Sequence, residues 1–339
     1  MVTSAVPEAG SPMRALALVK PGHVEVVERP VPTFTPTEVL VRVLGVGVCG
    51  SDLSVYDGHR QVPELPWIMG HEAVGEVVAV GSQVTGRQVG QRVVVEPNYC
   101  CFTCAACLAG ETSGCLNRVI VGMTSPGLLA DYIALPAAFA HPAPKELDLE
   151  ELICLEPYTV GVAASRRAQI QAGQSPLVVG TGSTGLLLIM HLVEHGLDVY
   201  FVEPSAERAQ LAEELGAKPF DPSSAPPIDQ VFETSGTVPG TQSALATARP
   251  GGNVTLLGLA AEPAAIVPSA IVRNRLTIRG SMIYDHPIDF DYCMGNPPRS
   301  LKKIVRGEFP LEQAQKAFAS ARTVPGKSWI SLVPMGENS

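Results

Sequence analysis

Short apolar and alternating runs, broken by Gly and Pro, dominate the chain from Met13 to about Ala140. Little of this stretch has helical periodicity, so it predicts the strands of a barrel or a curled sheet. The expected strands are Arg14–Val19, Val24–Glu28, Glu38–Val48, Ala73–Val80 and Arg92–Glu96. Around Glu150 the pattern becomes helical.

From Pro176 onward, short apolar strands alternate with helical segments. This alternation is typical of a parallel sheet that is buried on both faces and whose strands are connected by helices. The expected elements are the strands Leu177–Val179, Asp198–Glu203, Val231–Glu233, Asn253–Leu257 and Arg275–Ile278, and the helix Leu186–Glu194. After Asp285 the alternation fades. A helix is expected at Leu311–Ala321, and a last strand at Trp329–Val333 is a candidate to rejoin the first domain.

A glycine-rich turn joins the first of these strands to its helix. Its spacing supplies what a bound diphosphate needs: one glycine for the tight turn, one for backbone approach to the phosphate, and one for close helix–strand packing. The helix presents its positive dipole end to the anion. A structural turn without a ligand is the alternative, and the flanking strand and helix favour the dinucleotide. The candidate cofactor residues are Gly180, Gly182, Ser183, Thr184 and Gly185.

Glu203 ends the next predicted strand, 18 residues beyond Gly185. This is near the spacing of the acid that binds the adenosine ribose, and an anion there repels the 2′-phosphate of NADP. NAD is therefore the expected cofactor. Arg208 is the alternative signal, because it could turn toward such a phosphate; otherwise it is a solvated helix arginine.

The composition narrows the class of protein. A length of 339 residues favours two domains, and a net charge of −9 disfavours nucleic-acid binding. No run reaches the roughly 18 apolar residues of a membrane span. The stretch Met1–Pro12 lacks the apolar segment of a signal peptide and is expected to be a loose tail. Eight cysteines without such a signal indicate a reducing compartment, and a cytoplasmic protein is expected.

Five of the eight cysteines lie between Cys100 and Cys115. Four thiolates in one compact lobe make a closed tetrahedral zinc site, which is structural rather than catalytic. Cys100 competes with its neighbour for this set, and the repeated two-residue gap selects the neighbour. The predicted structural zinc ligands are Cys101, Cys104, Cys107 and Cys115.

A second set of potential ligands is dispersed along the chain: Cys49, His71 and Glu156. Sulfur, imidazole and carboxylate together form a three-ligand zinc site whose fourth position stays open, which is the catalytic arrangement. Spacing alone does not establish this site. Taken singly, a lone Cys is more often buried filler, and a lone His is more often a surface or core residue.

The motifs occur in an order that resembles the zinc-dependent medium-chain dehydrogenases, over about Met13 to Val333. The similarity is greatest to the polyol branch, which includes sorbitol, threonine and aminocyclitol dehydrogenases. The motifs that carry it are Cys49-Gly50-Ser51-Asp52, Gly70-His71-Glu72-Ala73-Val74-Gly75-Glu76-Val77-Val78, the four-cysteine lobe, Glu156-Pro157, the glycine turn and Glu233-Thr234-Ser235-Gly236.

The resemblance implies an α/β protein of two domains. A GroES-like, β-rich catalytic domain would span residues 13–158, with the structural zinc lobe at about 97–116. A Rossmann domain with a doubly wound parallel sheet would span residues 159–295. Residues 296–339 would return to the catalytic domain.

The resemblance also assigns roles to residues. Cys49, His71 and Glu156 would bind the catalytic zinc, and Glu72 would ligate it or exchange with water. Ser51 would bond the substrate hydroxyl and relay its proton, while Asp52 would hold the His71 tautomer. The nicotinamide pocket would involve Thr159, Leu257 and Gly258, for which ordinary helix and strand packing is the alternative, and Thr234 would be a further cofactor-binding residue.

The activity implied is NAD-dependent oxidation of a secondary alcohol of a polyol, sugar or aminocyclitol, by zinc-alkoxide formation and hydride transfer. Each chain would hold one catalytic and one structural zinc ion, and a homodimer or homotetramer is expected. Its partner would be a small alcohol substrate, without nucleic acid or membrane. A simple or terpenoid alcohol is the alternative substrate, and a non-catalytic zinc-stabilised scaffold is the alternative class.

Two departures from the branch stand out. Sorbitol-type enzymes carry a His shortly after the Cys-Gly-Ser-Asp box, where this chain has Ser54 and Tyr56. A second departure is Gly295-Asn296-Pro297-Pro298, where the two prolines forbid the uninterrupted helix that the family normally continues.

Overall fold

The computed structural model describes residues 6–333, and its chain divides into two compact units. Within the described residues, the first unit contains residues 6–156, 290–297 and 305–333, and the second contains residues 157–289 and 298–304. The expected boundaries at 158/159 and 295/296 differ slightly from this division. Phe290 belongs to the first unit, where its ring stacks on His141 with centroids 4.3 Å apart.

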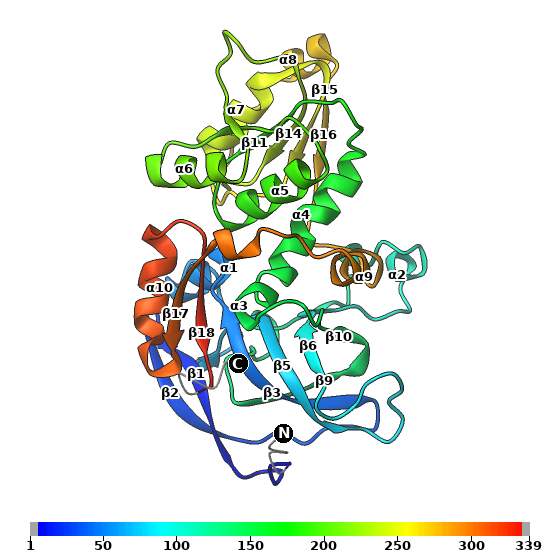
Figure 1. Ribbon diagram of the computed structural model, residues 1–339, viewed down its shortest axis with the longest axis vertical. Helices are drawn as coiled ribbons and strands as arrows, with labels where there is room; N and C mark the ends of the chain where they lie inside the picture. Colours follow the sequence, from blue (N-terminus) through cyan, green and yellow to red (C-terminus); the bar gives the residue numbers. More distant parts are fainter. Residues whose placement is uncertain (1–5, 334–339) are drawn as a thin grey trace. The chain divides into compact units, whose positions relative to one another are not determined.

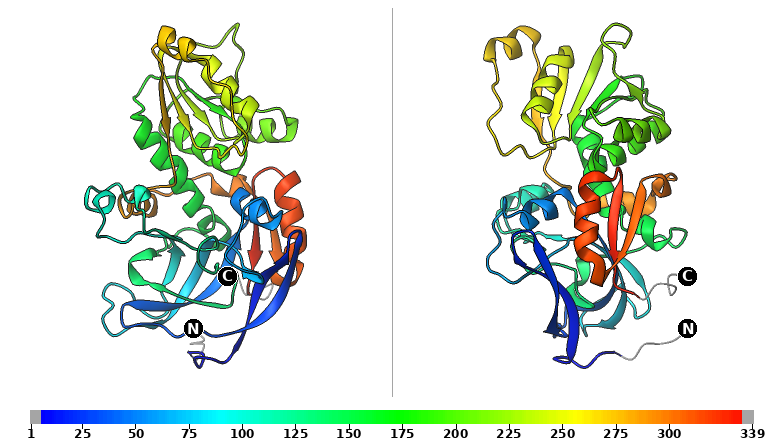
Figure 2. Two further views of the ribbon diagram at one scale, coloured as in Figure 1. Left: turned by 180° about the vertical axis from the view of Figure 1, so that it is seen from behind. Right: turned by 90° about the vertical axis from the view of Figure 1, so that its left-hand side faces the viewer.

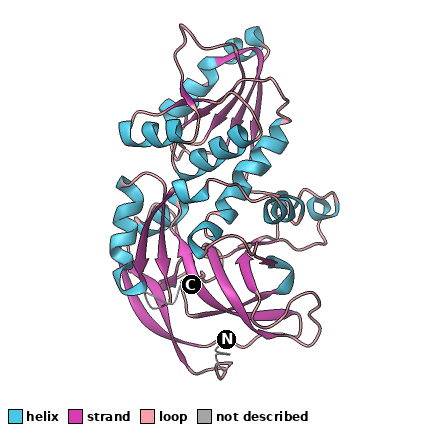
Figure 3. Ribbon diagram, viewed as in Figure 1, coloured by secondary structure: helices cyan, strands magenta, loops and turns pink. Residues whose placement is uncertain are grey.

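The first unit is built mainly of strands (Figures 1 and 3). Its largest sheet has seven strands in the order β10-β6-β5-β3-β18-β17, with β9 also paired to β3. A three-stranded sheet has the order β2-β1-β4, and β7 pairs with β8. The strands are β1 (Pro12–Lys20), β2 (His23–Pro30), β3 (Glu38–Gly47), β4 (Trp67–Ile68), β5 (Glu72–Val80), β6 (Arg92–Val95), β7 (Asn98–Tyr99), β8 (Val119–Ile120), β9 (Tyr132–Pro136), β10 (Ala140–Pro142), β17 (Val305–Pro310) and β18 (Lys327–Ser331).

Hydrophobic residues from distant parts of the chain form the core of this unit. Leu16, Val41 and Ile330 are at most 1% exposed. The last strand, β18, pairs antiparallel with β3, with Trp329 opposite Gly47. The C-terminal segment therefore completes the sheet of the first unit, as the apolar pattern of Trp329–Val333 had indicated.

The helices of this part of the chain are short. They are α1 (Gly50–Tyr56), α2 (Ala105–Leu108), η1 (Thr112–Gly114), η2 (Ala137–Phe139), α3 (Leu149–Leu152), α9 (Ile288–Gly295), η4 (Leu311–Gln313) and α10 (Ala314–Thr323). Helix α9 ends at Gly295, immediately before Asn296-Pro297-Pro298, because proline cannot continue the backbone hydrogen bonding. The helix expected at Leu311–Ala321 is a 3-10 turn followed by α10.

The second unit contains one parallel sheet of six strands, in the order β13-β12-β11-β14-β15-β16. Helices cover both faces of this sheet (Figure 2). The strands are β11 (Pro176–Val179), β12 (Tyr200–Val202), β13 (Lys218–Pro219), β14 (Ile228–Glu233), β15 (Ala248–Leu256) and β16 (Thr277–Gly280). The helices are α4 (Leu155–Ala168), which begins at the end of the first unit, α5 (Ser183–Glu194), α6 (Ala206–Glu214), α7 (Val238–Thr247), α8 (Pro268–Asn274) and η3 (Leu301–Lys303).

The predicted fold class, a β-rich domain followed by a doubly wound parallel-sheet domain, is confirmed. Several element boundaries were wrong. Strand β14 begins at Ile228 rather than Val231, and β15 begins at Ala248 rather than Asn253. The strand expected at Arg275–Ile278 begins at Thr277, because Arg275 ends α8 in the left-handed conformation with φ 51°. Helix α5 begins at Ser183 rather than Leu186, so the helix takes up the end of the glycine turn. None of the helices in the described residues is long and apolar enough to cross a bilayer.

Candidate functional site

Cys49 lies at the junction between β3 and α1 and is the N-cap residue of that helix. Its extended backbone, with φ −100° and ψ 159°, precedes the first helical turn. The backbone N–H of Cys49 donates to Oδ2 of Asp52 at 3.0 Å, as an N3 acid does in a capping box. The Cys-Gly-Ser-Asp box is therefore a helix start that fixes Cys49, Ser51 and Asp52 relative to one another.

His71 immediately precedes β5 and faces this helix start. Its Nδ1 lies 3.1 Å from Asp52 Oδ1, and its Nε2 lies 3.3 Å from Ser51 Oγ. Burial favours the neutral imidazole, but the charge and hydrogen bond of Asp52 outweigh it and raise the pKa of His71 well above its ordinary value. A metal ligand must be the neutral imidazole, so a cation at Nε2 competes with this proton.

The ligand atoms of Cys49, His71 and Glu72 all lie within 4.8 Å of one another. Sulfur, imidazole and carboxylate are a donor set that fits zinc, and the acid hydrogen-bonded to the far side of the imidazole is the usual support of a ligating His. Among the described residues, Glu156 is not part of this group. It is buried (5% exposed) in the first turn of α4, and its role as the third ligand stays a prediction.

Lys327, which the sequence analysis did not single out, is paired with Glu72. Its Nζ lies 2.8 Å from both carboxylate oxygens, and the two side chains are 1% and 0% exposed. Burial disfavours the charged amine, but the Glu72 carboxylate outweighs this and raises the pKa of Lys327. The local sequence shows only a lysine at the start of the apolar strand β18. A lysine at a strand end is just as common where that end is exposed, so the sequence did not indicate a buried ion pair.

Tight backbone packing adjoins this ion pair. A Cβ added at Gly47 of β3 would lie 2.2 Å from Glu72 Oε2. Such a contact is far below van der Waals distance, so a larger residue at position 47 would have to displace the buried carboxylate. The absence of a side chain at Gly47 therefore makes room for Glu72.

Tyr56, one of the two residues found after the Cys-Gly-Ser-Asp box in place of the expected His, takes part in packing. Its hydroxyl donates to Gly22 O at 2.5 Å, and its ring stacks on Phe318 with centroids 4.9 Å apart. The side chain thus fastens the end of α1 to α10. A proton relay from Ser51 would have to use other groups.

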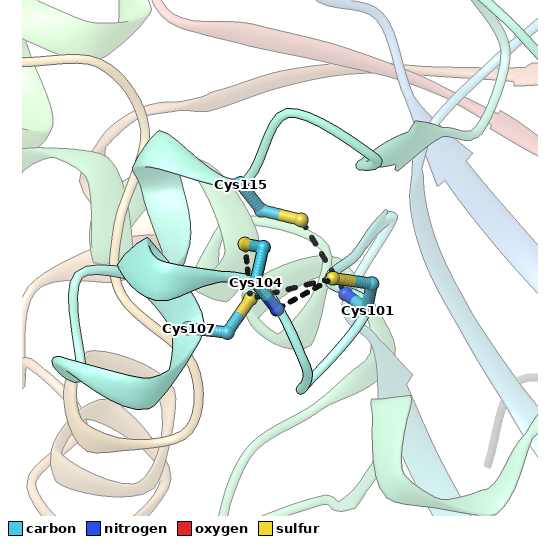
Figure 4. Close-up of side chains that lie close together, drawn as sticks. All are labelled: Cys101, Cys104, Cys107 and Cys115. Carbon is cyan, nitrogen blue, oxygen red and sulfur yellow. Dashed lines mark hydrogen bonds between the residues drawn. The ribbon is translucent and has the colours of Figure 1, made fainter.

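The cysteine lobe forms a second group of ligand atoms, all within 4.8 Å of one another, made by Cys101, Cys104, Cys107 and Cys115 (Figure 4). The Sγ atoms of Cys104 and Cys107 lie 3.5 Å apart. Hydrogen bonds from the Thr103 hydroxyl and from nearby backbone N–H groups lower the pKa of Cys101 to about 5, which favours the thiolate that zinc requires. Cys100 is outside this group, and burial raises its pKa.

Replacing Cys107 by serine should remove the metal of this lobe and destabilise the first unit. We expect a loss of one zinc ion per chain and a fall in melting temperature of about 5–15 °C, because structural zinc contributes folding free energy. Elemental analysis and differential scanning calorimetry measure the two effects. The control is Cys100→Ser, which should keep its zinc. Zinc loss in Cys100→Ser together with retention in Cys101→Ser would exchange the two assignments.

The glycine turn between β11 and α5 leaves room for a ligand beside its backbone. Gly180 has φ +91°, which only glycine adopts without strain, and a Cβ at Gly185 would lie 2.1 Å from Gly180 O. In contrast, a Cβ built at Gly182 would meet no atom of the described residues within 4 Å, apart from Gly182 itself and its chain neighbours. The turn is therefore closely packed toward the sheet and open at its middle glycine, which suits the approach of a diphosphate to the backbone.

Glu203, just beyond β12, binds the same turn. Its Oε2 accepts hydrogen bonds from Thr181 N at 2.8 Å and Thr181 Oγ1 at 3.1 Å, and its Oε1 accepts one from Ser205 N at 3.0 Å. A carboxylate offers about four lone pairs, so Oε1 keeps one for a ribose hydroxyl. Arg208 lies in the first turn of α6, where its N–H donates to the N-cap residue Ser205.

The loops after β14 and β15 lie against each other at the same edge of the sheet. Thr234 Oγ1 donates to Gly180 O at 2.7 Å, which ties the loop after β14 to the glycine turn. The N–H groups of Leu257 and Gly258 donate to Glu233 O at 2.8 and 3.0 Å. These candidate cofactor residues are thus brought together. Thr159 is 0% exposed in α4, which agrees with the packing alternative.

Two family descriptions match the chain. The alcohol dehydrogenase GroES-like domain covers residues 35–145, and the zinc-binding dehydrogenase family covers residues 183–294. The sorbitol dehydrogenase of Bacillus subtilis (strain 168) is 32% identical over 343 residues, covering 91% of this chain and 93% of its own.

Two solved structures show the same fold. One is the dehydrogenase RspB of Escherichia coli CFT073 in complex with NADH, with a TM-score of 0.87, 25% identity and coverage of 95% of this chain and 100% of its own. The other is a zinc-binding dehydrogenase of Sinorhizobium meliloti 1021 bound to NADP, with a TM-score of 0.86, 27% identity and coverage of 95% and 99%.

Proposed function

Because this chain belongs to the zinc-dependent medium-chain alcohol and polyol dehydrogenases, we propose that it oxidises a secondary alcohol of a polyol, sugar or aminocyclitol to the ketone, with NAD as hydride acceptor. The observation that carries the proposal is the group formed by Cys49 and His71 at the start of α1, supported by Asp52. A scaffold without activity has no physical need for this arrangement.

The first unit would hold the zinc ion with Cys49 and His71, together with Glu156 or Glu72. When bound, zinc supplies a Lewis acid that polarises a substrate oxygen and lowers its pKa. Asp52 holds a proton on His71 Nδ1 and so presents Nε2 for ligation. Ser51 Oγ, 3.3 Å from that nitrogen, would accept the hydroxyl proton of an adjacent substrate and pass it outward.

The second unit would hold the dinucleotide along the carboxyl edge of its sheet. The opening at Gly182 leaves space for the diphosphate, and Glu203 would accept a ribose hydroxyl on Oε1. A 2′-phosphate would bring its negative charge against the Glu203 carboxylate, which supports NAD over NADP. The two related structures contain NADH and NADP respectively, so the preference rests on Glu203 of this chain.

A substrate and cofactor panel tests the proposal. Polyols, sugars, aminocyclitols and simple alcohols are assayed by NADH absorbance, with NADP in parallel. We expect turnover of a polyhydroxylated secondary alcohol, and kcat/KM at least about tenfold higher with NAD, which corresponds to roughly 1.4 kcal/mol of repulsion at Glu203. Glu203→Gln should lower the ratio of kcat/KM with NAD to kcat/KM with NADP.

Three results of the panel would count against parts of the proposal. A tenfold or greater preference for NADP would refute the role given to Glu203. Turnover of simple or terpenoid alcohols alone would replace the substrate class. No turnover of any alcohol by the zinc-loaded protein would favour the scaffold.

A further inference from the structure

Ile283 has a backbone conformation that β-branched residues rarely adopt. Its φ is 40°, in the left-handed region. Such strain is unfavourable and persists only where the surroundings hold it in place. The strained residue therefore needs a partner that keeps its backbone in this shape.

Ile283 lies just beyond the carboxyl end of the edge strand β16. The chain reaches Ile283 three residues after β16 ends at Gly280, and Ser281 N still donates to Leu256 O at 2.9 Å. In open parallel sheets, ligands bind outside the carboxyl ends of the strands. With Glu203 following β12 and the glycine turn following β11, the adenosine and diphosphate of a bound dinucleotide would lie toward the β11 and β12 side of the sheet. The nicotinamide end of a dinucleotide would then extend over β14, β15 and β16.

Arg167, in the last turn of α4, holds this strained segment. Its Nη1 donates to Met282 O at 2.9 Å, Ile283 O at 2.8 Å and Ser281 Oγ at 3.1 Å. The side chain is only 16% exposed. Three acceptors from three successive residues converge on one nitrogen, so a single guanidinium determines the path of the loop.

The loop uses the carbonyl groups of Met282 and Ile283 for this contact, and its free amide groups among the described residues are those of the same two residues. Within residues 6–333, the N–H groups of Met282 and Ile283 donate no hydrogen bond, and Met282 is 42% exposed. Unpaired amides at the carboxyl edge of a parallel sheet are available to a ligand.

The Asp285 carboxylate keeps Arg167 in place and is shared with the neighbouring Arg166. Arg167 Nη2 lies 2.8 Å from Asp285 Oδ2. Arg166 Nε lies 2.6 Å from Asp289 Oδ1, and its Nη2 lies 2.8 Å from Asp285 Oδ2. The Asp285 and Asp289 side chains are 7% and 2% exposed, so two buried anions are balanced by two arginines. Arg166 bonds only the carboxylates, whereas Arg167 also bonds the loop backbone.

We infer that Arg167 is a positioning residue for the proposed dehydrogenase: its guanidinium holds the strained Met282–Ile283 backbone in the shape that receives the nicotinamide end of the dinucleotide. The inference rests on the proposed function, since it takes the cofactor to lie along this edge of the sheet.

Arg167→Met and Arg166→Met form a matched pair of variants. Both remove one guanidinium from the same buried network, but only the first releases the loop. NADH binding is followed by fluorescence titration, and ADP-ribose, which lacks the nicotinamide, is titrated calorimetrically. For Arg167→Met we expect about tenfold weaker NADH binding, ADP-ribose binding within about twofold of wild type, and a lower kcat. Arg166→Met should change NADH affinity by no more than about threefold, whatever its melting temperature.

Arg167→Lys keeps the positive charge of the side chain but not the shape of the guanidinium. It also serves as a second variant should Arg167→Met not fold. An ammonium keeps the ion pair with Asp285 but cannot reproduce the spread of a guanidinium over several acceptors. It should recover the melting temperature without recovering NADH affinity.

Several outcomes would overturn the inference. One is a parallel loss of NADH and ADP-ribose affinity in Arg167→Met or Arg167→Lys. Another is an equal loss of NADH affinity in Arg167→Met and Arg166→Met. A third is an unchanged NADH affinity in both Arg167 variants while the wild type binds both ligands. If the wild-type protein bound neither NADH nor ADP-ribose, the proposed function itself would fail.

Discussion

Alanine at His71 should reduce turnover at least about a thousandfold, because a metal Lewis acid contributes several kcal/mol to a reaction of this kind. The same variant should retain the zinc of the cysteine lobe and lose the second zinc ion. His71 is the residue to change, because its Nδ1 bond to Asp52 and its proximity to Cys49 place it at the centre of the group. Steady-state kinetics and elemental analysis of the purified protein measure the two effects.

Two further variants separate metal binding from proton transfer. Ser51→Ala should keep both zinc ions while lowering kcat, since the Ser51 hydroxyl lies beside His71 Nε2 and is assigned to the proton. Asp52→Asn should weaken metal affinity about 10- to 100-fold, the usual effect of a group that supports a ligating His. If His71→Ala kept a full complement of zinc, or if metal-stripped wild-type protein turned over normally, the proposed catalytic site would be wrong.

Methionine at Lys327 should destabilise the first unit by about 3–5 kcal/mol, because it leaves the Glu72 carboxylate buried without its partner. The two charged groups are 2.8 Å apart and almost completely buried, so neither can turn to solvent. The two tryptophans of the chain, Trp67 and Trp329, lie in the first unit, so urea unfolding followed by tryptophan fluorescence reports this unit.

The double variant Lys327→Met/Glu72→Gln is the control for charge. It removes both ions, so it should regain much of the stability that the single variant loses. The raised pKa of Lys327 means that its contribution is fully present below the unfolded pKa of about 10.4 and is lost only as pH rises through the folded pKa. The difference between wild type and Lys327→Met should therefore be constant from about pH 6 to 9. An equal loss in the single and double variants would show that side-chain packing, not charge, is responsible.

Local chemistry made much of this protein predictable. The strands of the first unit follow from alternating apolar runs, and the parallel sheet follows from β-branched runs that alternate with helices. The four-cysteine lobe was assigned from spacing, and the structure brings its four sulfur atoms together. The Cys-Gly-Ser-Asp box that begins at Cys49 also depends on neighbouring residues alone, because the Asp52 side chain caps the helix that Cys49 precedes.

Element ends were less predictable, since they depend on backbone details that hydrophobic patterns do not contain. The strand expected at Arg275 begins two residues later, because Arg275 has the left-handed conformation that ends α8. Helix α5 begins at Ser183, inside the turn, because the middle of a phosphate-binding turn can already be helical.

By itself, the sequence predicted the four-cysteine lobe and the glycine turn for a dinucleotide, because those motifs act over a few neighbouring positions whose spacing is visible along the chain. Only the tertiary structure decided which distant residues pair with one another. Lys327 meets Glu72 across 255 residues, and Arg167 meets Ile283 across 116. No periodicity connects positions so far apart, since a buried charge acquires its partner only when distant strands and helices pack together.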